Sequence, residues 1–229
     1  MKTPFHPQWL SLHSNIDTSK WLEEVASGRV LDVGCAGAGA KNSLHKSCEY
    51  IGLDYPSTAI AMYKTLPDVF ADGGQLPIKD ACIDTVLLLE VLEHIADAQS
   101  VVAEIHRVLK PGGSLLLSMP FLYPIHDAPY DYQRYTPYGL QHILRLNGFD
   151  VNWIKARNQG FSTVGLLATI SCADAVLSSL KKKSWTAIFI PLLVLAIPII
   201  NITTWAFSFF PDSEMIAGGY SVEARKKMN

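Results

Sequence analysis

Short apolar runs separated by amphipathic stretches dominate the first half of the chain. Each run has the length of a strand, and the first three lead into a small-residue loop or end in an aspartate. Between the last two runs, the stretch 98–109 places Val101, Val102 and Ile105 along one face of a helix. Strands that alternate with helices predict an α/β fold with a doubly wound, mostly parallel sheet. The predicted strands are residues 30–34, 50–54, 68–72, 83–89 and 114–119.

The later pattern completes a seven-stranded sheet. A short helix after Asp17 ends at Gly28, and a second helix covers residues 137–146. Residues 149–155 form the sixth predicted strand. Residues 220–225 alternate apolar and polar side chains with a period of two, which predicts a last strand with one face in solvent. The predicted parts are an N-terminal helical segment (1–28), a sheet domain (29–157 plus 216–226) and an apolar helical insert before the last strand (158–212).

Only 17% of the 229 residues are charged, and the insert accounts for the deficit. Residues 185–211 carry no charge and exceed the roughly 20 apolar residues that span a bilayer. Three lysines at 181–183 precede them, as on a cytoplasmic flank. Because predicted strands flank the insert, it crosses a membrane twice or not at all, as a hairpin broken at Pro191 or Pro198 or as a pair of interfacial helices. We expect membrane association at the cytoplasmic face; a soluble helical cap or a homodimer interface is the alternative.

Charge and cysteine usage narrow the class of partner. The net charge is −2 and no basic stripe is present, so a nucleic-acid partner is not expected. The four cysteines are scattered and form no CxxC pair, which excludes a dense disulfide framework and favours a reduced, cytoplasmic setting. No set of metal ligands is predicted from the sequence.

Glycines and acidic residues gather where the first three predicted strands end. Gly34 and Gly37 lie in a loop whose backbone can approach a ligand without an intervening Cβ. Asp54 follows about 20 residues later, the spacing of a carboxylate that binds two ribose hydroxyls, and Asp72 ends the third strand. Ligands bind beyond the carboxyl ends of parallel strands. These residues, with Asp32 as partner of a cationic amine, therefore predict a nucleoside-bearing ligand.

A dinucleotide is one candidate for that ligand. The spacing of Gly34, Ala36 and Gly39 loosely fits the GxGxxG fingerprint, with an acid about 20 residues further on. An NAD-dependent Rossmann oxidoreductase is therefore an alternative. Against it, Asp32 lies where a pyrophosphate would meet a negative charge, and no surplus of basic residues follows.

Five segments, taken in order, resemble the successive motifs of class I S-adenosylmethionine (SAM)-dependent methyltransferases. The segments are residues 30–35, 50–54, 71–77, 89–94 and 107–113. The resemblance implies a Rossmann-like methyltransferase fold over residues 29–155 plus the last strand, with Asp54 on the ribose, Asp72 on the adenine and Glu90 beside the sulfonium. At the position of Ala36 the family usually has glycine. The implied SAM-binding residues are Asp32, Gly34, Cys35, Ala36, Gly37, Asp54, Tyr55, Asp72, Gly73 and Glu90.

The loop 121–136 follows the fifth predicted strand and is rich in histidine, aspartate, arginine and tyrosine. Such a loop overhangs the cofactor end of the sheet and is a candidate substrate surface; a rigid packing loop is the alternative. For a hydroxyl acceptor, His126 is the candidate base, oriented by Asp127 or Asp131. Arg134 is a candidate ligand of a substrate phosphate or carboxylate. The predicted catalytic residues are His126 and Asp131, and the predicted substrate-binding residues are His94, Asp127, Tyr130, Arg134 and Tyr135.

The same loop resembles one branch of the methyltransferase family, with the pattern Pro-Phe-x-x-x-x-His-x-x-Pro-x-Asp-x-x-Arg-Tyr-Thr. Members of that branch are bacterial enzymes associated with cell-envelope glycan or lipid pathways. The resemblance implies in-line methyl transfer to oxygen of a small-molecule, lipid-linked or envelope-glycan acceptor. A non-catalytic, membrane-associated SAM-binding protein is the remaining alternative.

Overall fold

The computed structural model describes residues 2–13, 16–211 and 214–228, and the chain divides into two compact units. The first, here called the sheet unit, comprises residues 16–121, 125–155 and 220–229. The second, here called the hairpin unit, comprises residues 1–15, 122–124 and 156–219. The segment predicted as 1–28 is divided between them, because the 3-10 helix Trp9–His13 belongs to the hairpin unit and α1 (Thr18–Val25) to the sheet unit.

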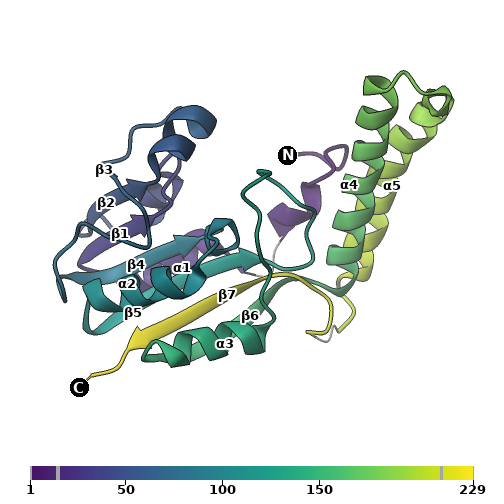
Figure 1. The fold of residues 1–229 in the computed structure, drawn as a ribbon. Helices are drawn as coiled ribbons and strands as arrows, with labels where there is room; N and C mark the ends of the chain where they lie inside the picture. Colours follow the sequence, from purple (N-terminus) through teal and green to yellow (C-terminus); the bar gives the residue numbers. More distant parts are fainter. Residues whose placement is uncertain (1, 14–15, 212–213, 229) are drawn as a thin grey trace. The chain divides into compact units, whose positions relative to one another are not determined.

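The sheet has seven strands in the order β3-β2-β1-β4-β5-β7-β6 (Figure 1). The pairs β2–β3, β1–β2, β1–β4 and β4–β5 are parallel, and the sheet as a whole is mixed, which confirms the predicted fold class. The order reverses at β1 and β4, the place where α/β sheets bind ligands. The strands are β1 (Arg29–Val33), β2 (Glu49–Asp54), β3 (Val69–Phe70), β4 (Ile83–Leu89), β5 (Leu109–Pro120), β6 (Phe149–Gln159) and β7 (Ala217–Lys226).

Capping residues and apolar faces explain where the helices of the sheet unit begin and how they pack. Helix α3 (Pro137–Leu146) has the predicted bounds, because Thr136 caps it by accepting from Gly139 N at 3.1 Å and Pro137 starts its first turn. Helix α1 begins after Asp17, whose side chain accepts from Lys20 N. Helix α2 (Ala98–Val108) buries the predicted apolar face.

Strand β5 is longer than predicted. The predicted strand is residues 114–119, yet β5 already starts at Leu109, directly after α2. The register with β4 passes from Ile83↔Leu109 to Thr85↔Ser114, so the extra residues form an irregularity in the ladder. Gly112 has φ 76° there, a backbone conformation that favours glycine.

Strand β7 corrects the expectation of one solvated face. Its residues from Ala217 to Ala224 are buried, although every second one was expected in solvent. Strand β7 lies between β5 and β6 and not at an edge of the sheet, so side chains of both neighbouring strands flank those of β7 on each face. The buried Glu223 accepts from Asn152 Nδ2 at 2.7 Å and from Trp153 Nε1 at 3.1 Å, so its polar atoms are satisfied.

Two long antiparallel helices, α4 (Gly160–Lys181) and α5 (Ile190–Phe207), dominate the hairpin unit and lie side by side (Figure 1). Gly165 permits the close approach, because a Cβ there would lie 2.1 Å from Thr204 Oγ1. Asn201 Nδ2 donates to the carbonyls of Pro4 and His6, at 2.6 and 3.0 Å, and so ties the N-terminal segment to α5.

The chain reverses direction in the turn after Lys181. Of the two predicted arrangements, the hairpin broken at Pro191 or Pro198 is therefore wrong about where the break lies. Pro191 lies in the first turn of α5, where a missing N–H is tolerated, and Pro198 lies inside the continuous helix. Both long helices are long and apolar enough to cross a membrane, on length and composition alone.

Candidate functional site

A cavity of about 910 Å³ lies at the carboxyl ends of β1 to β4. That volume is in the range of sites for small molecules and cofactors. Its walls come from the loops after these strands and from the segment 127–132, so we call it the cofactor cavity. Predicted site residues in its wall are Gly34, Ala36, Asp54, Tyr55, Asp72, Gly73, Glu90, His94, Asp127 and Tyr130.

Asp54 organises the first loop as well as facing the cofactor cavity. Its Oδ2 accepts from Ala36 N at 2.9 Å, and its Oδ1 accepts from Tyr55 N at 2.7 Å and Thr58 Oγ1 at 3.0 Å. The carboxylate is 4% exposed. Ionised carboxylates hold such N–H donors strongly, so Asp54 fixes the loop and retains acceptor capacity for ligand hydroxyls.

Gly34 and Ala36 both have left-handed backbone, with φ 77° and 44°. A Cβ on Gly34 would lie 2.5 Å from Val91 Cγ2, so this position needs glycine for space as well as conformation. Ala36 carries a Cβ in the same unfavourable region, which costs about 1–2 kcal/mol. The glycine expected at position 36 would remove that cost.

Replacing Ala36 with glycine is therefore expected to raise the free energy of unfolding by about 0.5–1 kcal/mol, after the greater entropy of glycine in the unfolded chain is counted. Urea unfolding measures the change. Ala38 is the control, because it has φ 54° and does not line the cofactor cavity. Ala38→Gly should give the same stabilisation, while only Ala36→Gly should tighten SAM binding. A loss of stability in Ala36→Gly would contradict this account.

Asp32 is not among the described residues that line the cofactor cavity. It is 3% exposed and accepts from Tyr50 Oη at 2.7 Å. Burial raises the pKa of Asp32 to about 6, against the hydrogen bond from Tyr50, which lowers it. Cys35 and Gly37 are also predicted to bind SAM, but they are not among the described residues that line the cofactor cavity. Burial raises the pKa of the Cys35 thiol to about 12, so that thiol stays protonated at neutral pH.

The raised pKa of Asp32 predicts a pH-dependent stability. Because the folded state binds this proton more tightly than the unfolded state, the free energy of unfolding falls as pH rises from about 4 to 6 and levels off above. The contribution of Asp32 to that fall is about 2–3 kcal/mol. Urea unfolding at pH 4 and pH 7 measures this fall. The free energy of unfolding should fall less between the two pH values in Asp32→Asn than in the wild type. Equal differences would show that Asp32 ionises normally in the folded protein.

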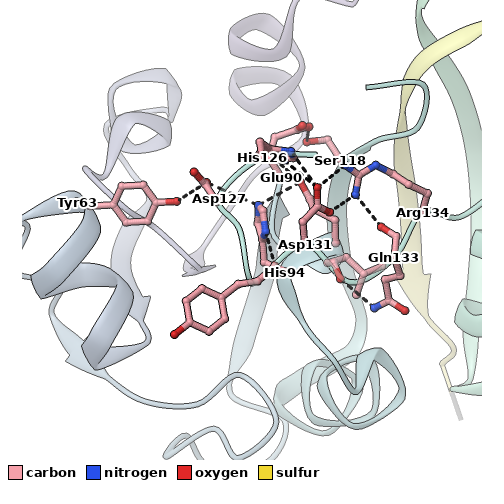
Figure 2. A network of polar contacts seen from close by, with 12 residues as sticks. Tyr63, Glu90, His94, Ser118, His126, Asp127, Asp131, Gln133 and Arg134 are labelled. Carbon is pink, nitrogen blue, oxygen red and sulfur yellow. Dashed lines mark hydrogen bonds and ion pairs between the residues drawn. The ribbon is translucent and has the colours of Figure 1, made fainter. Parts of the chain in front are cut away.

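A second cluster of polar side chains adjoins the cofactor cavity (Figure 2). Asp131, whose side chain is 3% exposed, accepts from both Nη groups of Arg134, from Nη2 at 2.8 Å, and from His126 N at 3.1 Å. Asp131 Oδ2 also lies 3.3 Å from His126 Nδ1. The Arg134 guanidinium holds the pKa of Asp131 low, at about 2. Arg134 therefore binds Asp131 and holds that carboxylate in position. This role adds to the substrate contact predicted for Arg134.

Sequence reasoning missed Glu93, which lies at the centre of this cluster. Its carboxylate is fully buried, with Oε1 3.7 Å from His94 Nε2 and 3.8 Å from His126 Nε2. Burial, followed by the neighbouring charge of Glu90, raises the pKa of Glu93 to about 8. The only available sequence signal is the apolar context of the Leu-Glu-Val-Leu-Glu-His segment.

The other predicted residues differ in their access to the cofactor cavity. Asp127, with φ 49°, lines the cavity and accepts from Tyr63 Oη at 3.4 Å. Glu90 has φ 55° and accepts from Ser118 Oγ at 2.7 Å. Non-glycine residues in such conformations concentrate at functional sites. Tyr135 donates its hydroxyl to Gln133 Oε1 and is absent from the described wall, as is His126.

Comparison with known proteins agrees with this geometry. Residues 31–117 match the family model described as a methyltransferase domain. The fold resembles that of a putative methyltransferase from Bacillus halodurans, at TM-score 0.55 and 19% identity over 93% of this chain and 100% of that one. It also resembles a phosphoethanolamine N-methyltransferase from Haemonchus contortus solved with SAM, at TM-score 0.53 and 19% identity over 92% of this chain and 51% of that one. Residues 31–117 of the sheet unit are therefore similar to a methyltransferase domain, and the fold is that of the methyltransferase structures compared.

Two curated proteins are similar in sequence to part of this chain. A probable SAM-dependent methyltransferase of Mycolicibacterium smegmatis is 34% identical over 57% of this chain and 51% of its own length. A ubiquinone biosynthesis O-methyltransferase of Pseudomonas aeruginosa is 29% identical over 55% of this chain and 57% of its own length. The chain thus spans about half the length of the curated relatives it matches.

Proposed function

We propose that the protein transfers a methyl group from SAM to an oxygen atom of a lipid-linked or cell-envelope glycan acceptor. The observation that carries the proposal is the cofactor cavity, in which Asp54 and Asp72 stand at strand ends and the buried Glu93 cluster lies alongside. The name of the ubiquinone O-methyltransferase relative supports oxygen as the acceptor atom. A hydroxyl acceptor must lose a proton, and a carboxylate with two imidazoles suits that step.

In this proposal the protein mainly positions the acceptor in line with the methyl group and the leaving sulfur. His94, Asp127 and Tyr130 in the cavity wall are the acceptor contacts. The proton leaves through the Glu93–His94–His126 cluster. Asp131 orients His126 through Nδ1, and Arg134 keeps Asp131 ionised.

Thermal unfolding with SAM and NAD tests the cofactor, and mass spectrometry tests the acceptor. A ligand at 100 times its Kd stabilises the fold by about 2.7 kcal/mol, so SAM should raise the melting temperature while NAD leaves it unchanged. Membrane and glycan extracts incubated with protein and isotopically labelled SAM should then yield a labelled product. A shift with NAD alone would favour an oxidoreductase, and a SAM shift without any labelled product would favour a non-catalytic binding protein.

We also propose that the hairpin unit attaches the protein to the cytoplasmic face of a membrane. Large apolar side chains on η5 (Trp185–Phe189) and α5 are exposed, among them Ile188, Leu192 and Leu195 at 75%, 64% and 60%. The three exposed lysines at 181–183 lie at the turn between the two helices. Positive charge favours the cytoplasmic side, which supports a hairpin lying in the interface with its turn against anionic headgroups.

Replacing the three lysines at 181–183 with glutamine is expected to weaken binding to phosphatidylserine-containing vesicles by roughly 100-fold, because each lysine near the surface contributes about 1 kcal/mol. Vesicle flotation measures the bound fraction. The control replaces the exposed Lys20, Lys46 and Lys79 in the sheet unit. Loss of vesicle binding in both triple variants would indicate non-specific electrostatic attraction. A protein that forms a homodimer without detergent and does not bind vesicles would instead favour the dimer interface.

A further inference from the structure

Three potential metal ligands converge beside the cofactor cavity. Glu93 Oε1 lies 3.7 Å from His94 Nε2 and 3.8 Å from His126 Nε2, and all three ligand atoms fall within 4.8 Å of one another. The two imidazole rings meet edge to face with centroids 4.8 Å apart. Bonds of about 2.0–2.2 Å to a tetrahedral ion place ligand atoms about 3.4 Å apart. The two distances from Glu93 need a contraction of a few tenths of an ångström, and the distance between the two histidine nitrogens, within 4.8 Å, needs one of up to about 1.4 Å.

The contacts of the two Nδ1 atoms orient both rings so that their Nε2 atoms face Glu93. His94 Nδ1 lies 2.8 Å from the carbonyl oxygen of Tyr130, which only accepts, so Nδ1 carries the hydrogen. His126 Nδ1 faces Asp131 Oδ2 at 3.3 Å, and Arg134 keeps that carboxylate ionised. Both contacts are ones that an Nδ1–H group satisfies. A backbone carbonyl and a carboxylate are the partners that orient metal-binding histidines.

Glu93 supplies an independent observation. Its side chain is 0% exposed, and neither carboxylate oxygen has a hydrogen-bond partner among the residues that the structure describes. A buried carboxyl group that faces two imidazole nitrogens without a hydrogen bond to either is unfavourable, because neither of its oxygens is satisfied. A cation between them satisfies all three at once.

We propose that Glu93, His94 and His126 bind one divalent transition-metal ion of the zinc class. Two imidazoles and one carboxylate are the ligand set of catalytic zinc sites that keep a position open for water or substrate. The two nitrogen ligands disfavour Mg²⁺ and Ca²⁺, which take oxygen ligands. His94 also lines the cofactor cavity, so the site adjoins the space available to an acceptor.

A role in catalysis rests on the proposed methyl transfer. With the ion bound, Glu93, His94 and His126 would act as its ligands and not as proton acceptors. An acceptor hydroxyl on the ion would then lose its proton to solvent more easily, as metal-bound water does. The oxygen then forms a bond to the methyl carbon with its electron pair while the carbon–sulfur bond breaks. The sulfonium charge is thereby neutralised on the departing S-adenosylhomocysteine.

Calorimetric titration of the chelator-treated full-length protein with Zn²⁺, without SAM or acceptor, tests the site directly. One ion per chain should bind. Glu93→Gln and His126→Gln should each weaken binding by at least about 100-fold, because loss of an orienting partner alone costs 10–100-fold. His142→Gln is the control, because His142 is exposed on α3. Co²⁺ should show the absorption of a low-coordinate site in the wild type and in the control only.

Two further readouts keep the outcome clear. A rise in melting temperature with SAM shows that each variant is folded, so loss of Zn²⁺ binding in a folded variant supports the site. In the metal-free protein, Glu93→Gln should match or exceed the wild type in melting temperature, because it removes a buried unpartnered carboxylate. Stoichiometric Zn²⁺ binding that persists in both ligand variants, or no binding to the wild type, would overturn the proposal and leave methyl transfer itself untouched.

Discussion

Replacing Asp54 with alanine is expected to weaken SAM binding by at least about 100-fold and to abolish methyl transfer at ordinary SAM concentrations. The carboxylate holds Ala36 N and Tyr55 N in the loop around the cofactor cavity. It is also the group proposed to bind the ribose. Each hydrogen bond to a charged group contributes about 1.5–3 kcal/mol, so two lost ligand contacts alone account for a 100-fold change. Calorimetric titration with SAM gives the affinity.

Asp68 and Asp72 provide matched controls for this experiment. Asp68 accepts from Gly52 N at 2.8 Å, as Asp54 does from its loop, but it is absent from the described cavity wall, so Asp68→Ala should retain SAM binding. Asp72 is exposed in the cavity wall and accepts from Gly74 N at 2.8 Å. Asp72→Ala should therefore cost only about 10-fold, as loss of one such contact does. If Asp54→Ala kept full SAM affinity, the proposal that SAM binds in the cofactor cavity through Asp54 would be wrong.

Replacing Arg134 with methionine is expected to lower the free energy of unfolding by about 3–5 kcal/mol. Asp131 is 3% exposed and Arg134 neutralises it through both Nη groups, so the variant leaves a buried charge without its main partner. Methionine keeps most of the side-chain volume, which separates the charge effect from a packing defect. Urea unfolding followed by circular dichroism measures the change.

The double variant Arg134→Met with Asp131→Asn separates positioning from substrate binding. It removes the buried charge together with its partner and should recover a large part of the stability. Arg145→Met is the control, because Arg145 is exposed on α3 and should cost less than about 0.5 kcal/mol. If Arg134→Met instead kept its stability and lost only affinity for the acceptor, Arg134 would be a substrate ligand, as the sequence pattern predicts.

The loops at strand ends could be placed from sequence because their signals are local. A glycine or an aspartate directly after an apolar run stays at the carboxyl end of its strand, and parallel strands bring those ends to one edge. Gly34, Asp54 and Asp72 accordingly line one cavity. Asp32 lies inside β1 and not after it, so its side chain points to one face of the sheet, where it accepts from Tyr50 and does not line the cavity.

The Glu93 cluster was beyond the reach of pattern reasoning. Glu93 and His126 are far apart in the chain and meet only because the loop after β5 returns beside β4, its neighbour in the sheet. The same reason explains the burial of Glu223 in β7, since alternation describes one strand and not the neighbours that cover it. The position of the hairpin turn depended likewise on how α4 packs against α5 around Gly165.

The sequence by itself determined the features that act within one or two turns of chain. These include the cap of α3 by Thr136, the bounds of β4, the glycine at position 34 and the apolar character of the insert. Tertiary structure alone decided which polar groups meet in a water-excluded space, and so why Glu93 has a raised pKa and two imidazoles beside it. The physical reason is that desolvation and ligand geometry depend on the strand order and on loop return, which no local pattern encodes.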